Sequence, residues 1–406
     1  MGRAQYNSLN SFLKYLSIKN QNKTIRMGQS MKTIALEEYE HIVVYKKEDE
    51  YAGWPFNCGL WKFSGNEILV GFIRNKCAYR FPEDVSHRRI QYINGQFVTI
   101  RSRDGGRTWL QNELKTIYNS KAELRAKIQY YVTIGDKFPK PLAANFLNGT
   151  TALATEPPLG QENGPTAFFI TYDRGYKWDG PYLLYVDAFD TIQARPSYVV
   201  DDDGRIMLFV QGLRKDEVSK GYRNIEPEGR PMVIVSEDGA ISWRFLSYIL
   251  SPNPDLPRIC PSPAILPDGR IAVALRVLGP GRGIQWTELY ISEDGGLTWR
   301  FMSRVNKWGA PASLVTLRDG RLLCVYGYRV PPYGIRARIS SDGGASWGPE
   351  IIIRDDGGGT DLGYPRAIEL SNGKILTVYY FNSKDDKIQY DGGVRHIAAT
   401  IFEPPY

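Results

Sequence analysis

An eight-residue pattern, Ser/Thr-x-Asp-x-Gly-x-x-Trp, recurs five times along the 406-residue sequence, with Ala240 in place of the glycine in one copy. Asp and Gly within four residues are typical of a tight turn, because the carboxylate accepts backbone N–H groups and glycine adopts positive φ. Each copy follows a β-rich run such as WTELYI or PMVIV, so the pattern predicts a repeated hairpin corner whose Trp packs between neighbouring sheets. The copies are SRDGGRTW at Ser102, TYDRGYKW at Thr171, SEDGAISW at Ser236, SEDGGLTW at Ser292 and SSDGGASW at Ser340.

A second pattern alternates with these corners and consists of two β-rich runs joined by an Asp-Gly or Asn-Gly turn. It is clearest in ICPSPAILPDGRIAVALR. Each combined unit therefore contains four antiparallel strands in about 45–70 residues, which is the size of a propeller blade. The copies of the second pattern span 140–156, 195–214, 259–276, 312–329 and 364–382.

Five units carry a corner, and a sixth unit, from residue 364, lacks one. Its outer strand can come from HIVVYKK near the N-terminus, which would remove open sheet edges. We therefore expect an all-β fold over residues 32–406: a six-bladed β-propeller closed by pairing of an N-terminal strand with the C-terminal blade. Seven blades are the alternative.

Residues 1–31 hold five of the seven excess positive charges and no acidic residue. We expect a disordered basic extension there and a nearly neutral remainder with no pattern for nucleic-acid binding. No signal peptide or membrane span is evident, so the expected location is cytoplasmic, or secreted if the start codon is misassigned. The four cysteines lack C-x-x-C spacing, and we expect neither a metal nor another cofactor.

The position of the candidate site follows from the geometry of a blade. In each blade the second strand ends, and the first strand begins, at the same face of the propeller, around the central channel. Six polar side chains stand at odd offsets, seven or nine residues, from the glycine of the first turn in their unit. With a period of two, these side chains share one strand face. They are Arg74, Glu156, Gln211, Arg276, Arg329 and Tyr380.

The starts of the first strands add five residues that each precede a proline: Trp54, Lys140, Arg195, Cys260 and Tyr364. Guanidinium groups at one mouth of the channel predict an anionic ligand, most naturally a carboxylate held bidentately. The alternative is that the arginines pair with acids of the loops, namely Asp187, Asp190, Asp355, Asp356 and Asp361.

Five such corners, known as Asp-boxes or BNR repeats, on six four-stranded units resemble the sialidase/neuraminidase superfamily over about residues 32–404. The resemblance implies three arginines on a sugar carboxylate, a tyrosine nucleophile with a glutamate partner, and an aspartate acid/base. The segment DLGYPRAIELSNGKILTVYY resembles the one that carries the nucleophile, which would be Tyr364, and Arg276 and Arg329 resemble two of the arginines. The chain departs from the family where GWPFN replaces Arg-Ile-Pro and where Cys260 stands in place of the glutamate.

The loop DVSHRRI of the first blade lies where sialidases keep their acid/base aspartate. Asp84 could be that acid, and His87 is the alternative, because imidazole titrates near neutrality. Activation of a phenol requires a carboxylate base, for which Glu156 is the first candidate and Asp361 the second.

The sequence thus predicts an exo-acting glycoside hydrolase that removes a terminal acidic sugar from a glycan, with Arg74, Arg276 and Arg329 on the carboxylate. Trp54, Arg195, Gln211 and Tyr380 would complete the substrate-binding surface. One alternative is a propeller polysaccharide lyase acting on a uronate, with His87 and Tyr364 as base and acid. The other is a glycan-binding propeller without turnover.

Overall fold

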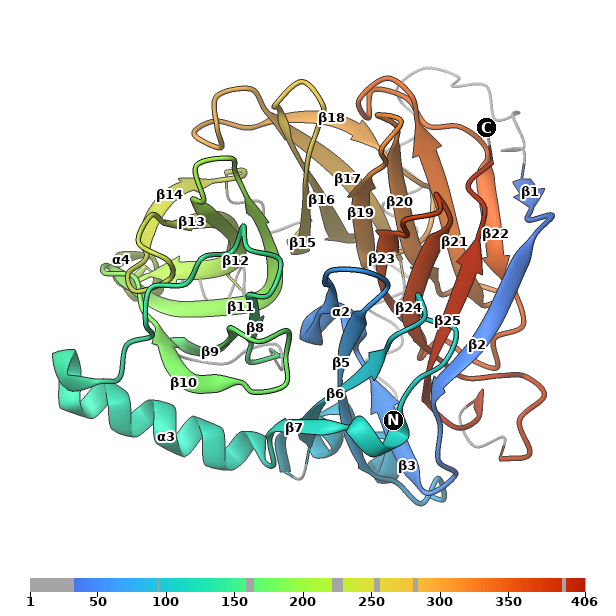
Figure 1. Cartoon of the computed structure of the whole chain (residues 1–406), viewed down its shortest axis with the longest axis horizontal. Helices are drawn as coiled ribbons and strands as arrows, with labels where there is room; N and C mark the ends of the chain where they lie inside the picture. The colour runs from blue at the N-terminus through green and yellow to red at the C-terminus, as the bar shows by residue number, and fades with distance from the viewer. Residues whose placement is uncertain are drawn as a thin grey trace, which may run out of the picture.

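The computed structural model describes residues 33–93, 95–157, 164–220, 229–251, 256–279, 284–388 and 392–405. The strands of these residues form six sheets arranged as a ring, with the short helix α2 (Pro55–Cys58) toward its middle (Figure 1). The six-bladed β-propeller expected from the sequence is therefore confirmed. The extension expected over residues 1–31 lies outside the described residues.

The first three blades contain the strands β3 to β14. Blade I comprises β3 (Glu50–Gly53), β4 (Leu60–Lys62), β5 (Ile68–Lys76), β6 (Gln96–Ser102) and β7 (Lys115–Tyr118). Blade II comprises β8 (Ala152–Thr155), β9 (Thr166–Thr171) and β10 (Asp179–Leu184). Blade III comprises β11 (Phe189–Val200), β12 (Ile206–Arg214), β13 (Arg230–Ser236) and β14 (Arg244–Tyr248).

The last three blades return the chain to the first. Blade IV comprises β15 (Arg258–Ile265), β16 (Ile271–Leu278), β17 (Gln285–Ser292) and β18 (Arg300–Arg304). Blade V comprises β19 (Ala312–Thr316), β20 (Leu322–Tyr328), β21 (Gly334–Ser340) and β22 (Glu350–Arg354). Blade VI comprises β23 (Gly363–Glu369), β24 (Ile375–Phe381), β25 (His396–Phe402) and β2 (Tyr39–Tyr45).

Closure of the ring follows the prediction, because β2 pairs antiparallel with β25 as the outer strand of blade VI. An additional strand that the sequence pattern did not indicate, β1 (Thr33–Ala35), runs parallel to β22 and extends blade V. The N-terminal segment therefore covers β22 and β25 and provides the outer strands of two adjacent blades.

Blade II is the least regular sheet, since the first strand expected within residues 140–148 is not formed. Pro139 and Pro141 cannot donate to a strand ladder. Instead the segment runs along the corner of blade III, where Ala144 N donates to Gly239 O at 2.9 Å.

The helical elements all lie in connections. The longest described helix, α3 (Lys121–Ile134), lies outside the ring beside blade II, and no described helix is long and apolar enough to cross a membrane (Figure 1). The others are α4 (Lys215–Ser219), the 3-10 turns η1 (Pro82–Val85), η3 (Gln111–Glu113) and η4 (Gly135–Lys137), and the π turn η2 (Arg89–Ile93).

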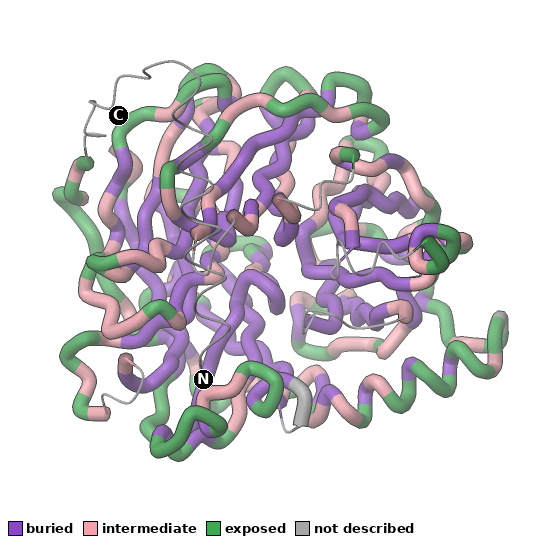
Figure 2. The backbone as a smooth tube through the Cα atoms, turned by 180° about the vertical axis from the view of Figure 1, so that it is seen from behind, coloured by how far each residue is buried: buried purple, intermediate pink, exposed green. Residues whose placement is uncertain are grey.

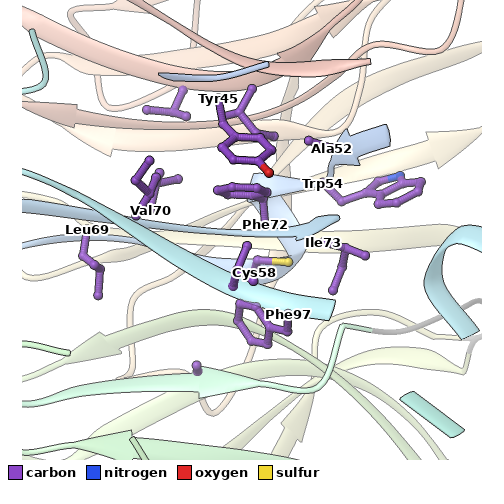
Figure 3. Close-up of a cluster of buried hydrophobic side chains, with 14 of the residues drawn as sticks. Tyr45, Ala52, Trp54, Cys58, Leu69, Val70, Phe72, Ile73 and Phe97 are labelled. Atoms are coloured by element: carbon purple, nitrogen blue, oxygen red, sulfur yellow. The ribbon is translucent and has the colours of Figure 1, made fainter. Parts of the chain in front are cut away.

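The hydrophobic core consists of layers between neighbouring blades, and the strands are buried along most of their length while the loops are exposed (Figure 2). In blade I, Phe72 meets Tyr45 of blade VI at a centroid distance of 5.1 Å, and Phe97 projects from the opposite face of the sheet (Figure 3). The Asp-box tryptophans extend such layers as expected: the ring of Trp299 meets Phe209 of the preceding blade at a centroid distance of 5.8 Å. Asp294 of the same box accepts from the backbone N–H of Leu297 and Thr298, which explains why the corner requires an aspartate.

Candidate active site at the channel mouth

Three residues at the mouth of the channel adopt left-handed backbone conformations that side chains rarely take. Trp54, Cys260 and Tyr364 have φ of 61°, 58° and 48°, and each precedes a proline. Such conformations cost about 1–3 kcal/mol each and persist only where the surrounding structure imposes them, typically at functional sites. The pairing register shifts at Cys260 and at Tyr364, so bulges bend β15 and β23 at this mouth.

Two guanidinium groups converge on Tyr364. Arg276, on β16, donates from Nη1 to Tyr364 Oη at 3.1 Å. Arg329, just after β20, has its Cζ 5.1 Å from the centre of the Tyr364 ring and is fixed by a 3.0 Å bond from Nε to Leu362 O. The phenol of blade VI is thus flanked by positive charges from blades IV and V.

Asp361 is the hydrogen-bonding centre of the neighbouring part of the site. Its Oδ2 accepts from Tyr51 Oη at 2.9 Å and from Arg395 Nε at 3.0 Å. Its Oδ1 accepts from Tyr380 Oη at 2.7 Å and lies 3.0 Å from His87 Nε2. Loops and strands of blades I and VI therefore meet on one carboxylate.

The environment keeps Asp361 ionised. Burial by itself raises its pKa, but the charges of His87 and Arg395 and the hydrogen bond from Tyr380 outweigh burial and hold the pKa well below the usual range. Burial, reinforced by the charge of Asp361, raises the pKa of Tyr51 and of Tyr380 well above that of a free phenol. These two tyrosines are therefore neutral hydrogen-bond donors.

His87 lies over an aromatic wall. Its ring meets Trp54 edge-on at 4.9 Å, and Trp54 stacks on Tyr51, also at 4.9 Å. The His87 side chain is 48% exposed while that of Asp361 is 15% exposed, so the imidazole is open to solvent on one side and held by a carboxylate on the other. This is the arrangement that general acid/base catalysis requires.

Gln211 and Arg195 form a polar floor beside Cys260. Gln211 Oε1 accepts from Arg195 Nη1 at 2.6 Å and from Cys260 N at 3.2 Å. Arg195 also donates from Nε to Asn57 Oδ1 of α2 at 3.1 Å. Cys260 and Tyr364 in turn pack against Phe56 of α2, so the floor is continuous with the tyrosine.

The strand phase expected for two residues, Arg74 and Glu156, is wrong. The Asp-box serine or threonine provides a common reference, because it pairs with the first residue of the second strand in each of the five blades that carry a box: Ile68, Ala152, Ile206, Ile271 and Leu322. Gln211 and Arg276 stand five residues after that position and Arg329 seven. Arg74 stands six residues after it and Glu156 four, which puts both on the opposite face of their strands.

The reason is that the first turns of blades I and II carry their glycine one position earlier than the others. Gly65 lies three residues before Ile68 and Gly149 three before Ala152, whereas Gly269 lies two before Ile271. A count from these glycines is therefore one residue too long, which assigns the side chain to the wrong face of the strand.

The contacts of Arg74 and Glu156 agree with this position. Arg74 donates to Tyr45 Oη at 2.9 Å and to Gln96 Oε1 at 3.0 Å, between blades I and VI. Glu156 Oε2 accepts from Arg125 of α3 at 3.2 Å and from Thr166 at 3.0 Å. We therefore leave both out of the candidate site.

Asp84 also has a local role. It accepts from Arg80 N at 3.0 Å, from Phe81 N at 3.3 Å and from Arg89 Nη1 at 3.1 Å, which caps η1 and holds the loop that carries His87. The backbone hydrogen bond from Arg80, followed by that from Phe81, lowers its pKa against the effect of burial. Of the two acid/base candidates of this loop, His87 is the one that faces Asp361.

Sequence reasoning missed Tyr51 and Arg395 as members of the site and treated Asp361 only as a possible base or partner. Arg395 is fully buried and precedes β25, a strand without a turn glycine or a box to place it. The one available signal was a charged residue, in DGGVRHI, directly before an apolar strand. Among the described residues, no group of three or more His, Cys, Asp or Glu is placed to hold a metal ion.

The fold and the site define a class of protein: a six-bladed propeller with Asp-box corners and a cluster of polar and aromatic side chains at the mouth of its channel. A family model described as BNR repeat-like domain matches residues 140–377, more than half of the chain, and the protein belongs to that family. No curated protein matches the sequence.

Solved structures with the same fold include proteins of different activity. A Dyadobacter fermentans DSM 18053 protein of unknown function is 25% identical, with a TM-score of 0.67, covering 90% of this chain and 98% of that one. The Hadza microbial sialidase Hz136 is 15% identical with a TM-score of 0.55, covering 87% and 66%. A Penicillium chrysogenum α-L-arabinanase complexed with arabinobiose is 11% identical with a TM-score of 0.56, covering 89% and 97%.

Proposed function

We propose that the protein is an exo-acting glycoside hydrolase that removes a terminal acidic sugar from a glycan. The observation that carries the proposal is the convergence of Arg276 and Arg329 on Tyr364, beside the His87–Asp361 pair. The neighbouring folds of a sialidase and of an arabinanase holding arabinobiose support a glycan as the substrate class.

Arg276 and Arg329 bind the substrate carboxylate in this proposal. Guanidinium groups suit this task because their parallel N–H donors match the two oxygens of a carboxylate. With the carboxylate on these arginines, the ring carbon that bears it lies near Tyr364, and this carbon is the reacting one in a sugar such as a sialic acid.

Tyr364 Oη attacks that anomeric carbon and forms a glycosyl–tyrosine bond while the bond to the departing oxygen breaks. The phenol proton passes to solvent water as this bond forms and returns to Tyr364 Oη when water displaces the tyrosine from the sugar. Arg276 Nη1, at 3.1 Å from Oη, stabilises negative charge as it develops on the nucleophile. An uncharged phenol also avoids the repulsion that a carboxylate nucleophile would meet from an anionic substrate.

His87, held by Asp361, donates a proton to the departing oxygen and then accepts one from the water that releases the sugar. The imidazolium is favoured at the moment it forms because Asp361 is ionised and lies 3.0 Å away. Tyr51 and Tyr380 keep the carboxylate oriented toward the imidazole.

A second candidate function, β-elimination on a uronate, is favoured by one specific observation. Among the described residues, no hydrogen bond joins a carboxylate to Tyr364 Oη, because Glu156 is bound to Arg125 and Asp361 to Tyr380. In an elimination the arginines would neutralise the uronate carboxylate, His87 would remove the α-proton, and Tyr364 would protonate the departing oxygen.

One assay distinguishes the candidates. The purified protein is incubated with aryl glycosides of sialic acid and of uronic acids and with uronate-containing oligosaccharides, and both reducing sugar and ultraviolet absorbance are followed. Release of a reducing acidic sugar, lost in Tyr364→Phe and retained in Tyr185→Phe at a 43% exposed position, supports hydrolysis. An unsaturated uronate without hydrolysis would establish the lyase, and binding without either product would establish a binding module.

A further inference from the structure

A cavity of about 320 Å³ lies further along the channel than the candidate active site. All six blades contribute to its wall, through residues 60–63, 146, 149, 151–152, 196–198, 262–263, 313–314 and 366–367. Along the chain, these residues come after Trp54, Cys260 and Tyr364 and lead to the first turn of each blade. The cavity therefore lies toward the opposite face of the propeller.

The wall of this cavity is rich in hydrogen-bond donors, and its described lining residues include no carboxylate. Three serine hydroxyls on successive blades already accept from the protein: Ser197 from Arg366 at 2.9 Å, Ser262 from Leu314 N at 3.0 Å and Ser313 from Ala367 N at 3.1 Å. A hydroxyl has only one hydrogen, so each serine still has that hydrogen to donate to an acceptor.

Thr151 supplies an independent observation. Its side chain lines the cavity, the residue is 8% exposed, and its buried Oγ1 has no hydrogen-bond partner among the described residues. Buried polar atoms in native proteins are almost always hydrogen-bonded, so an unpartnered hydroxyl in a polar cavity indicates a bound species or water.

Arg366 contributes the positive charge. It donates to Phe56 O from Nε at 3.1 Å and from Nη2 at 2.7 Å, and it has no ion pair within the described part of the chain. Burial, followed by the charge of Arg195, lowers its pKa to about 10, so the guanidinium remains charged at neutral pH. A buried charge without a counter-ion is costly, and a bound anion would remove that cost.

We propose that this cavity is a binding site for a small oxyanion, held by Arg366 and by the hydroxyls of Thr151, Ser197, Ser262 and Ser313. Sulfate, phosphate and a simple carboxylate share the required chemistry: a negative charge and several acceptor oxygens. The cavity, at about 320 Å³, accommodates one such ion with part of its hydration.

The site is connected to the candidate active site by one residue. The Arg366 guanidinium lies 4.3 Å from the centre of the Phe56 ring, and that ring meets Tyr364 at 6.3 Å. A bound oxyanion therefore stabilises α2, which forms the partition between the two sites.

Calorimetric titration with sodium sulfate, sodium phosphate and sodium acetate, at constant ionic strength set by sodium chloride, tests the proposal. We expect saturable binding of at least one ion, weakened about tenfold or more in Arg366→Gln, because a charge-assisted contact is removed. Thr151→Val should weaken it as well, while the exposed Arg300→Gln leaves it unchanged. If Arg366→Gln does not fold, Arg366→Lys and Thr151→Val carry the test.

The arginines of the candidate active site are a competing location for the same ions. Arg276→Gln should therefore retain the binding that Arg366→Gln loses, and selenate soaked into crystals should give an anomalous peak beside Arg366. Loss of binding only in Arg276→Gln, equal affinity in Arg366→Gln and the unaltered protein, or no binding of any of the three ions would overturn the proposal.

Discussion

His87 Nε2 lies 3.0 Å from Asp361 Oδ1, although the two residues are 274 positions apart in the sequence. The contact joins the long loop of the first blade to the entry of the last blade. Closure of the propeller therefore brings together an imidazole and a carboxylate that neither blade carries alone.

Asp361→Asn should reduce kcat by roughly 10²–10⁴-fold, the usual contribution of a general acid/base. The amide keeps an oxygen acceptor for Tyr380 but removes the negative charge that favours the imidazolium of His87. Turnover of an aryl glycoside, corrected for the folded fraction, measures the effect. Asp355→Asn, on an exposed loop, is the matched control, and unchanged kcat in Asp361→Asn would rule out the pair as acid/base.

Arg276→Lys and Arg329→Lys should have different kinetic effects. Lysine keeps the charge but loses the bidentate donor pattern of arginine. Because Arg276 Nη1 contacts Tyr364 Oη at 3.1 Å, we expect Arg276→Lys to lower kcat, whereas Arg329→Lys, whose cation lies over the ring, should mainly raise KM. Steady-state kinetics separate the two, and identical changes in both variants would contradict separate roles.

The fold could be predicted because its signals are local. The hydrogen bonds of an Asp-box lie within its own eight residues, as in the bonds from Thr298 to Asp294. The box can therefore be recognised without knowledge of distant contacts. The pairing of β2 with β25 could be inferred as well, since the sixth unit of the sequence lacked an outer strand.

The site could be predicted only where a strand carried a reliable register. Arg276, Arg329 and Tyr380 were placed near Tyr364 by counting from turn glycines, and that count failed for Arg74 and Glu156, whose turns differ by one residue. The Ser102 and Thr171 of the Asp-boxes would have given the correct phase, since they pair with Ile68 and Ala152. Arg395 and Tyr51 reach Asp361 through tertiary packing, which no local pattern records.

Gly344→Ala should destabilise the protein more than Gly269→Ala. Both glycines have positive φ, 92° and 84°, so an added methyl group costs about 1–2 kcal/mol at either position. A Cβ at Gly344 would also overlap the buried side chain of Leu289, whereas a Cβ at Gly269 meets nothing within 4 Å. We expect a total loss of about 2–4 kcal/mol for Gly344→Ala by denaturant unfolding. Equal losses of unfolding free energy in the two variants would show that the corner shifts to accommodate the methyl group at position 344.

Stability should fall between pH 6.5 and pH 4 because of His396. Its Nδ1 lies 3.0 Å from Val394 O in the core of blade VI. Burial, with the charges of Lys46 and Arg354, lowers its pKa from 6.5 to about 4, although the hydrogen bond to Val394 and the charge of Asp386 act in the opposite direction. In that interval the unfolded chain binds a proton that the folded chain does not, so acidification favours unfolding.

The shift corresponds to about 3 kcal/mol of unfolding free energy lost by pH 4. Urea denaturation across this range should therefore show a smaller pH dependence in His396→Gln than in the unaltered protein. His41→Gln should flatten the curve as well, because burial, and then the charge of Arg354, lower the pKa of His41 from 6.5 to about 4 against the charge of Asp356. A pH dependence identical in His396→Gln and in the unaltered protein would assign the titration to another group.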